Sequence, residues 1–69
     1  MEKCQITFYL KNHKTKDIVI DATSLSDAQN YLHQVLPEYT SAYTFISIDD
    51  EKPFTISFFD IQFISYKAL

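Results

Sequence analysis

The sequence predicts a small α+β domain in the order ββαββ, with one antiparallel or mixed four-stranded sheet and a single amphipathic helix packed on one face. Three observations support this prediction. Residues 4–10 and 17–22 alternate apolar and polar side chains, residues 25–36 repeat with a helical period, and β-rich segments flank a charged turn after Pro37. Because 69 residues bury enough surface for one core at most, residues 1–69 are predicted to form a single domain.

The first two strands are predicted to form a β-hairpin. Even positions of residues 4–10 are Cys, Ile, Phe and Leu, and residues 17–22 repeat the alternation with Ile18, Ile20 and Ala22 on one side. Such a period of two is typical of a strand with one buried face. The connection, residues 12–15, is short and polar, and its Asn tolerates the left-handed conformation that a turn without Gly needs.

An amphipathic helix of about three turns follows the hairpin. Ser24 and Asp27 resemble a capping box at its start, and Pro37 ends it. At 100° per residue the apolar positions fall within one arc of about 140°. These positions are Leu25, Ala28, Tyr31, Leu32, Val35 and Leu36.

The remaining residues predict a second hairpin with a bend in its last strand. Residues 43–48 are rich in β-formers, residues 49–52 form a charged turn, and Pro53 precedes the next strand. Within residues 54–66 the apolar positions change parity twice. A straight strand would then turn them to opposite faces. We therefore expect a bulge or a single helical turn near Asp60, whose carboxylate bonds nearby backbone amides. A last strand begins at about Gln62, and the expected strand order is 2-1-3-4.

One helix can cover only one face of such a sheet, so the other face is predicted to be aromatic and uncovered. A contiguous apolar patch of more than a few hundred Å² is unusual on a monomer, and it indicates a partner. An alternative is that the C-terminal segment, with Ala68 and Leu69, folds across this face. The predicted interaction face consists of Tyr9, Val19, Tyr43, Phe45, Phe59, Phe63 and Tyr66.

The two hairpin tips carry opposite charge. The basic tip, defined by Lys11, His13, Lys14 and Lys16, contrasts with three acidic residues at 49–51. The predicted strand directions place the tips at opposite ends of the sheet. Such polarity would favour an antiparallel arrangement of two protomers by a small, salt-sensitive amount.

Catalytic and metal sites are not predicted. Cys4 shares its parity with the buried positions of its strand, and neither His13 nor His33 lies where it would activate that thiol. The acids at 49–51 lack the spacing of a calcium loop. The chain contains no Gly, which excludes phosphate-binding and dinucleotide loops in their usual forms. We therefore expect no enzyme activity and no cofactor.

Composition favours a cytoplasmic protein. No apolar run of about 18 residues is present, so no membrane span is expected, and the first residues do not resemble a signal peptide. The absence of Gly and Arg beside abundant Ile, Lys, Phe and Tyr is typical of A+T-rich coding sequences, as in a low-G+C bacterium or its phage. The net charge of −3 disfavours nucleic-acid binding in general.

Two functional hypotheses follow. The first is a non-enzymatic protein-interaction module that binds itself, as a homodimer, or an unidentified protein, through the aromatic sheet face or an edge strand. The alternative is a single-stranded nucleic-acid-binding domain that uses the aromatic face and the basic tip, because bases stack on aromatic rings and cations contact phosphates.

Overall fold

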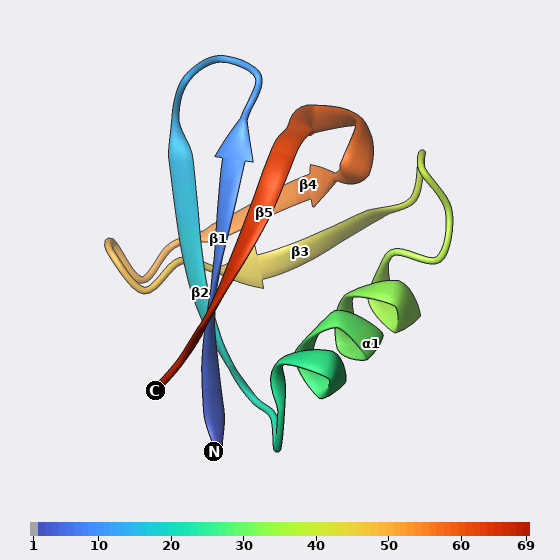
Figure 1. Cartoon of the computed structure of the whole chain (residues 1–69). Coiled ribbons are helices and arrows are strands. Elements are labelled where there is room, and N and C mark those ends of the chain that lie inside the picture. Colours follow the sequence, from blue (N-terminus) through green and yellow to red (C-terminus); the bar gives the residue numbers. More distant parts are fainter. Residues whose placement is uncertain (1) are drawn as a thin grey trace.

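A computed structural model describes residues 2–69, which form one α-helix and five strands in two antiparallel sheets (Figure 1). The elements in chain order are β1 (Lys3–Leu10), β2 (Thr15–Asp21), α1 (Leu25–Val35), β3 (Ala42–Ile46), β4 (Pro53–Ser57), the 3-10 turn η1 (Phe58–Asp60) and β5 (Ile61–Ala68). One sheet has the order β2-β1-β5, and the other is the β3–β4 hairpin.

The α+β class is therefore confirmed, but the single four-stranded sheet and its order 2-1-3-4 are wrong. The predicted fourth strand is two strands, and its second half, β5, pairs antiparallel with β1 from Cys4 opposite Ala68 to Leu10 opposite Ile61. Strand β3 pairs with β4 alone, from Ala42 opposite Ser57 to Ile46 opposite Pro53. The chain thus changes sheet between β4 and β5.

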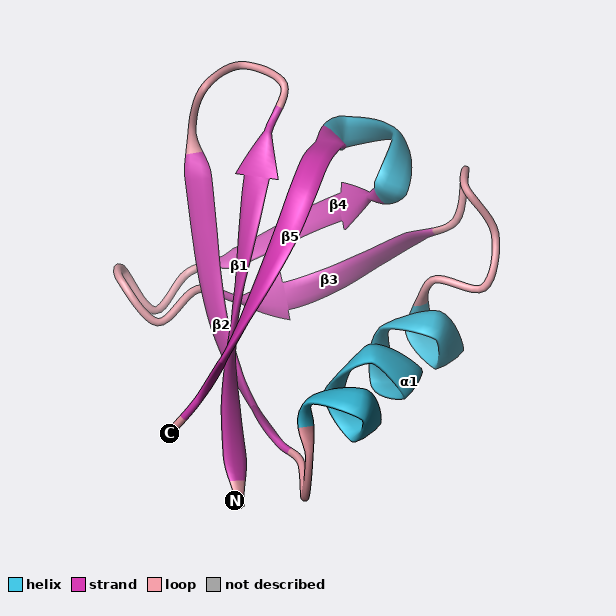
Figure 2. Cartoon of the chain, viewed as in Figure 1, coloured by secondary structure: helices cyan, strands magenta, loops and turns pink. Residues whose placement is uncertain are grey.

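The η1 turn causes this change of sheet, and it confirms the predicted bend at Asp60 (Figure 2). The Asp60 carboxylate accepts hydrogen bonds from both the backbone N–H and the hydroxyl of Ser57, each at 3.2 Å. These bonds hold one helical turn between two extended segments. The apolar residues can therefore change parity and still face one core.

Helix α1 has the predicted caps and buried face. The Ser24 hydroxyl accepts the Asp27 N–H at 3.0 Å, and the Asp27 carboxylate accepts the Thr23 N–H at 3.1 Å. Ala28 and Leu32 are buried on the helix, and Leu36 is buried directly after it. Leu36 leaves the helical conformation, as expected for a residue that precedes a proline.

The core lies between the three-stranded sheet on one side and α1 with the β3–β4 hairpin on the other. Cys4, Ile6 and Phe8 of β1 have no exposed surface, and the Phe8 ring lies 5.4 Å from that of Phe45 on β3. The two sheets also meet at a backbone hydrogen bond of 3.0 Å from the Ile48 N–H to the Asp17 carbonyl. Two covering elements thus shield the inner face of the sheet, where one was predicted.

Both hairpin turns contain a residue with positive φ, although the chain has no Gly. His13 (φ 67°) and Glu51 (φ 57°) take these positions. In the first turn the Asn12 side-chain oxygen accepts the Lys14 N–H at 3.1 Å. In the second turn the Asp50 carboxylate accepts the Lys52 N–H, also at 3.1 Å. Asn12 was expected to adopt the left-handed conformation, but it closes the turn with its side chain instead.

The two charged tips do not lie at opposite ends of one sheet. The acidic turn follows β3, and Ile48 within the same connection bonds Asp17 of β2. The hydrogen bond from the Lys52 N–H is the main cause that lowers the pKa of the Asp50 carboxyl, and the positive charge of Lys16 is a smaller cause. The acidic turn therefore lies beside the basic hairpin, because β3 and β4 form a separate sheet.

Candidate functional site

The predicted aromatic face is divided among several places. Tyr9, Val19 and Phe63 lie on the outer face of the three-stranded sheet, because Phe8, Ile18 and Ile64 beside them in sequence face the core. The Tyr9 and Phe63 rings stack with centroids 4.1 Å apart and an angle of 14° between their planes. These two rings form one aromatic pair on that face.

The other four predicted residues lie elsewhere. Phe45 is 5% exposed and belongs to the core, so its assignment to an interaction face is wrong. Tyr66 is half-buried on the inner side of β5. Tyr43 packs beside Phe45 on the β3–β4 hairpin, and Phe59 projects from η1 with 58% of its surface exposed. The change of sheet at η1, which the sequence did not define, separates these residues.

Apart from Val19, the rest of the outer face is polar. The Thr7 hydroxyl donates to the Asp17 carboxylate, and Lys3 forms an exposed ion pair with Asp21 at 2.9 Å. The C-terminal segment does not cross this face, since it continues β5 beside β1 and ends with the Leu69 N–H bonded to the Lys3 carbonyl at 3.1 Å. The alternative of a covering tail is therefore wrong, and a broad aromatic face does not exist.

The backbone of β5 offers a different candidate interface. The hydrogen bond from the Leu69 N–H to the Lys3 carbonyl shows which residues of β5 bond β1. Because hydrogen-bonded pairs alternate along an antiparallel ladder, these are the odd-numbered residues from Phe63 to Lys67. The N–H and C=O groups of Ile64 and Tyr66 consequently point away from β1. No residue within 2–69 forms a backbone hydrogen bond with these outward groups.

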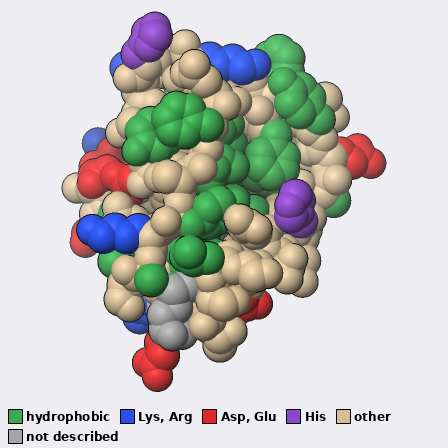
Figure 3. All heavy atoms as spheres, in the orientation of Figure 1, with side chains coloured by type: hydrophobic (Ala, Val, Ile, Leu, Met, Phe, Trp, Pro, Cys, Tyr) green, Lys and Arg blue, Asp and Glu red, His purple; other side chains and the backbone are tan. Residues whose placement is uncertain are grey.

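The side chains along β5 make this edge apolar. On the face shown in Figure 3, hydrophobic side chains run in a band from η1 along β5, whereas the area over β2 is mainly polar. Ile64 and Tyr66 are half-buried, and Phe63 is 54% exposed. Burial raises the pKa of the Tyr66 hydroxyl, and the nearby Cys4 thiol is a smaller cause.

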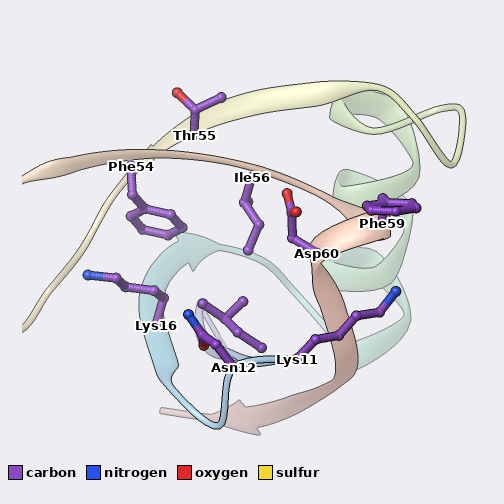
Figure 4. A pocket seen from close by; sticks show the side chains of 9 residues that line it. Lys11, Asn12, Lys16, Phe54, Thr55, Ile56, Phe59 and Asp60 are labelled. Carbon is purple, nitrogen blue, oxygen red and sulfur yellow. The ribbon is translucent and has the colours of Figure 1, made fainter.

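The basic tip lies beside a second candidate site, a groove of about 550 Å³ between the β1–β2 hairpin, β4 and η1 (Figure 4). A backbone hydrogen bond of 3.2 Å from the Lys11 N–H to the Asp60 carbonyl joins two of its walls. The groove is lined by Leu10, Lys11, Asn12, Lys16, Phe54, Thr55, Ile56, Phe59 and Asp60. Apolar side chains therefore form much of its surface, with lysines at its rim.

Each rim lysine lies over a phenyl ring. The Lys11 ammonium is 4.6 Å from the centroid of Phe59, and the Lys16 ammonium is 5.7 Å from that of Phe54. The two ammonium groups point toward opposite ends of the groove (Figure 4). Such cation–π contacts orient the lysines and leave their charge available to an anion.

The remaining predicted tip residues and the cysteine lie outside this groove. His13 and Lys14 are exposed at the hairpin tip. Cys4 is a buried free thiol, as its parity predicted. In the part of the chain that the structure describes, no group of His, Cys, Asp or Glu is arranged to hold a metal ion, and no helix is long and apolar enough to cross a membrane.

Comparisons of the chain with protein-family models, with curated proteins and with solved structures gave no match. The sequence did not reveal the unpaired backbone groups of Ile64 and Tyr66 on β5, nor the contact between Lys16 and Phe54. The parity change near Asp60 could have indicated that the last strand is free to join another sheet, but it does not specify which strand it joins.

Proposed function

We propose that this protein is a small non-enzymatic interaction module that self-associates by pairing β5 with β5 of a second copy. The observation that supports this proposal is the eight-residue β5 edge, whose outward backbone groups have no partner among residues 2–69. An unpaired strand edge is a template for another strand, and long apolar edges are normally blocked by charge, proline or a covering element. Ile64, Ser65 and Tyr66 provide no such block.

A two-fold axis would place two β5 strands antiparallel, since each copy then presents the same edge to the other. With Ser65 at the axis, Ile64 of one copy lies opposite Tyr66 of the second copy, and Phe63 lies opposite Lys67. The first is an aromatic–β-branched cross-strand pair, and the second brings an ammonium group toward a phenyl ring. This register therefore joins side chains that suit one another on both faces.

The resulting assembly is closed. The sheet becomes β2-β1-β5-β5-β1-β2, and its two outer edges are both β2. Strand β2 is a poor template, because its Asp17 carbonyl already accepts the Ile48 N–H. A dimer rather than a fibre is the expected product.

The test measures molar mass by size-exclusion chromatography with light scattering over a wide concentration range. Ser65→Glu and Ser65→Lys each place like charges across the axis, so each should raise the dissociation constant at least ~10-fold. An equimolar mixture of the two variants should associate again. Thr15→Glu, an exposed change at the β2 edge of the same sheet, is the matched control and should leave the dissociation constant unchanged.

A wild-type chain that keeps the mass of one copy at the highest attainable concentration would overturn the proposal. Association that Ser65→Glu and Ser65→Lys both leave intact would place the contact away from β5, with the same consequence. Circular dichroism checks that each variant is folded. Ser65 is exposed, so its replacement should disturb no core contact.

A further inference from the structure

The groove beside the basic tip has a charge pattern that the β5 edge does not explain. Lys11 and Lys16 place one positive charge at each end, and an apolar middle lies between them. A small monoanion reaches only one of these ends. A ligand that satisfies both is extended, with an anionic group at each end and an apolar group between them.

We propose that this groove binds single-stranded nucleic acid. Successive phosphates contact Lys11 and Lys16, and a base lies in the apolar middle, near the rings of Phe54 and Phe59. Bases stack on aromatic side chains with little regard to sequence, while lysines follow the backbone. A volume of about 550 Å³ falls in the range of small-molecule and cofactor sites, so it accommodates one base with its sugar.

Acidic groups near the groove limit the path of the strand. The Asp60 carboxylate is bonded to the Ser57 N–H and hydroxyl, and it points toward β4 in Figure 4. Asp50 lies near Lys16 and weakens the field at that end. The exposed Lys14 extends the positive charge past Lys11, so the strand leaves the groove over the hairpin tip.

The groove is separate from the proposed dimer contact. Its lining residues come from the β1–β2 hairpin, β4 and η1, together with Leu10 at the end of β1, and Ile64 and Tyr66 do not line it. The two proposals can therefore fail independently. A variant that remains monomeric can still be tested for nucleic-acid binding.

The experiment measures fluorescence anisotropy of a labelled short oligothymidylate against the full chain at several salt concentrations. If two phosphates are neutralised, the logarithm of the association constant should fall against the logarithm of the salt concentration with a slope of about −1.4. Lys11→Gln should reduce the magnitude of that slope by about 0.7, the share of one phosphate. Lys3→Gln removes the same charge from the outer sheet face and should leave the slope unchanged.

A second pair of variants locates the base. Phe59→Ala, at an exposed ring on η1, should weaken binding by roughly 5- to 150-fold, the range for loss of one stacked base. Tyr43→Ala removes an exposed ring from β3, outside the lining of the groove, and should have no such effect. Equal losses for the two variants would place binding outside the groove and overturn its assignment.

Absence of binding at low salt would also overturn the proposal. Equal loss from Lys3→Gln and Lys11→Gln would show non-specific attraction and would have the same consequence. A labelled polyglutamate peptide is tested in parallel, because it carries repeated charge without flat rings. Preference for this peptide over the oligothymidylate would exclude nucleic acid as the ligand of the groove.

Discussion

The two edges of the three-stranded sheet differ in how well they are protected. At the β2 edge, the Asp17 carbonyl accepts the Ile48 N–H, and Val19 shares a shallow groove with Thr44 and Phe45 of β3. At the β5 edge, the outward groups of Ile64 and Tyr66 have no backbone partner within residues 2–69. Both edges flank the same buried strand, β1, so the difference arises from what lies beside them.

This difference shows that coverage of a sheet edge is a separate property from coverage of its face. Helix α1 and the β3–β4 hairpin shield the inner face completely enough to bury Cys4, Ile6 and Phe8. The hairpin also approaches β2, but it does so at one edge only. An edge whose outward backbone groups lack a partner favours pairing with another strand.

Removing the protection of β2 should have the largest effect. Ile48→Pro deletes the N–H that bonds Asp17, which should lower the free energy of unfolding by about 1–2 kcal/mol. Each chain would then have two open edges, so assemblies larger than a dimer should appear in light scattering. Ile48→Ala truncates the side chain but keeps the N–H, and it should form nothing larger than the wild type. Identical masses for both variants would show that this bond does not protect β2.

Hydrogen exchange should distinguish the edges residue by residue. The amides of Ile64 and Tyr66 point outward on β5, and that of Val19 points outward on β2. When the protein is concentrated from below the dissociation constant to about 100 times that value, exchange at Ile64 and Tyr66 should slow on the order of tenfold. The Val19 amide should exchange at an unchanged rate. Slowing at Val19 instead would assign the contact to β2.

The smallest expected effect concerns alkaline pH. Burial raises the pKa of Tyr66 above its ordinary 10.0, so the folded state binds this proton more tightly than the unfolded state. The contribution of Tyr66 to stability is therefore complete below pH 10.0 and is lost as the pH rises through the raised pKa. Pairing at β5 would cover Tyr66 further, so the dissociation constant should also rise above that pH.

Sedimentation equilibrium at neutral and alkaline pH tests this expectation, with Tyr66→Phe as the comparison. The alkaline weakening of association should be smaller in this variant than in the wild type. Burial also raises the pKa of Tyr31, with Tyr43 as a smaller cause, so stability alone does not separate the two tyrosines. Association does separate them, because Tyr31 lies beside β2 and β3, where it lines a shallow groove with Val19 and Thr44. Unchanged weakening in Tyr66→Phe would contradict the assignment.

Local features were predictable where a short pattern had one physical solution. The Ser24 cap, the end of the helix before Pro37 and the bend at Asp60 each depend on contacts within a few residues. The candidate sites were less predictable. Phe45 and Phe59 are both aromatic residues near a turn, yet one is buried in the core and the other is 58% exposed.

The groove illustrates the same limit. Lys11 and Lys16 were predicted as part of a basic tip, but their contacts with Phe59 and Phe54 join residues more than thirty positions apart in the sequence. The prediction of an aromatic sheet face failed because it assumed one sheet, in which a lone helix leaves the second side bare. With two sheets, the hairpin and the helix share one face, and the other face is mainly polar.

The sequence by itself determined the helix, the strands and the bend, because apolar period, caps and backbone-bonding side chains act over a few residues. The tertiary structure alone decided that β5 leaves β4 and joins β1. That choice depends on which distant surface β5 can bury and bond, a property of the packed chain rather than of any local pattern. The same choice protects β2 and leaves the backbone of β5 open.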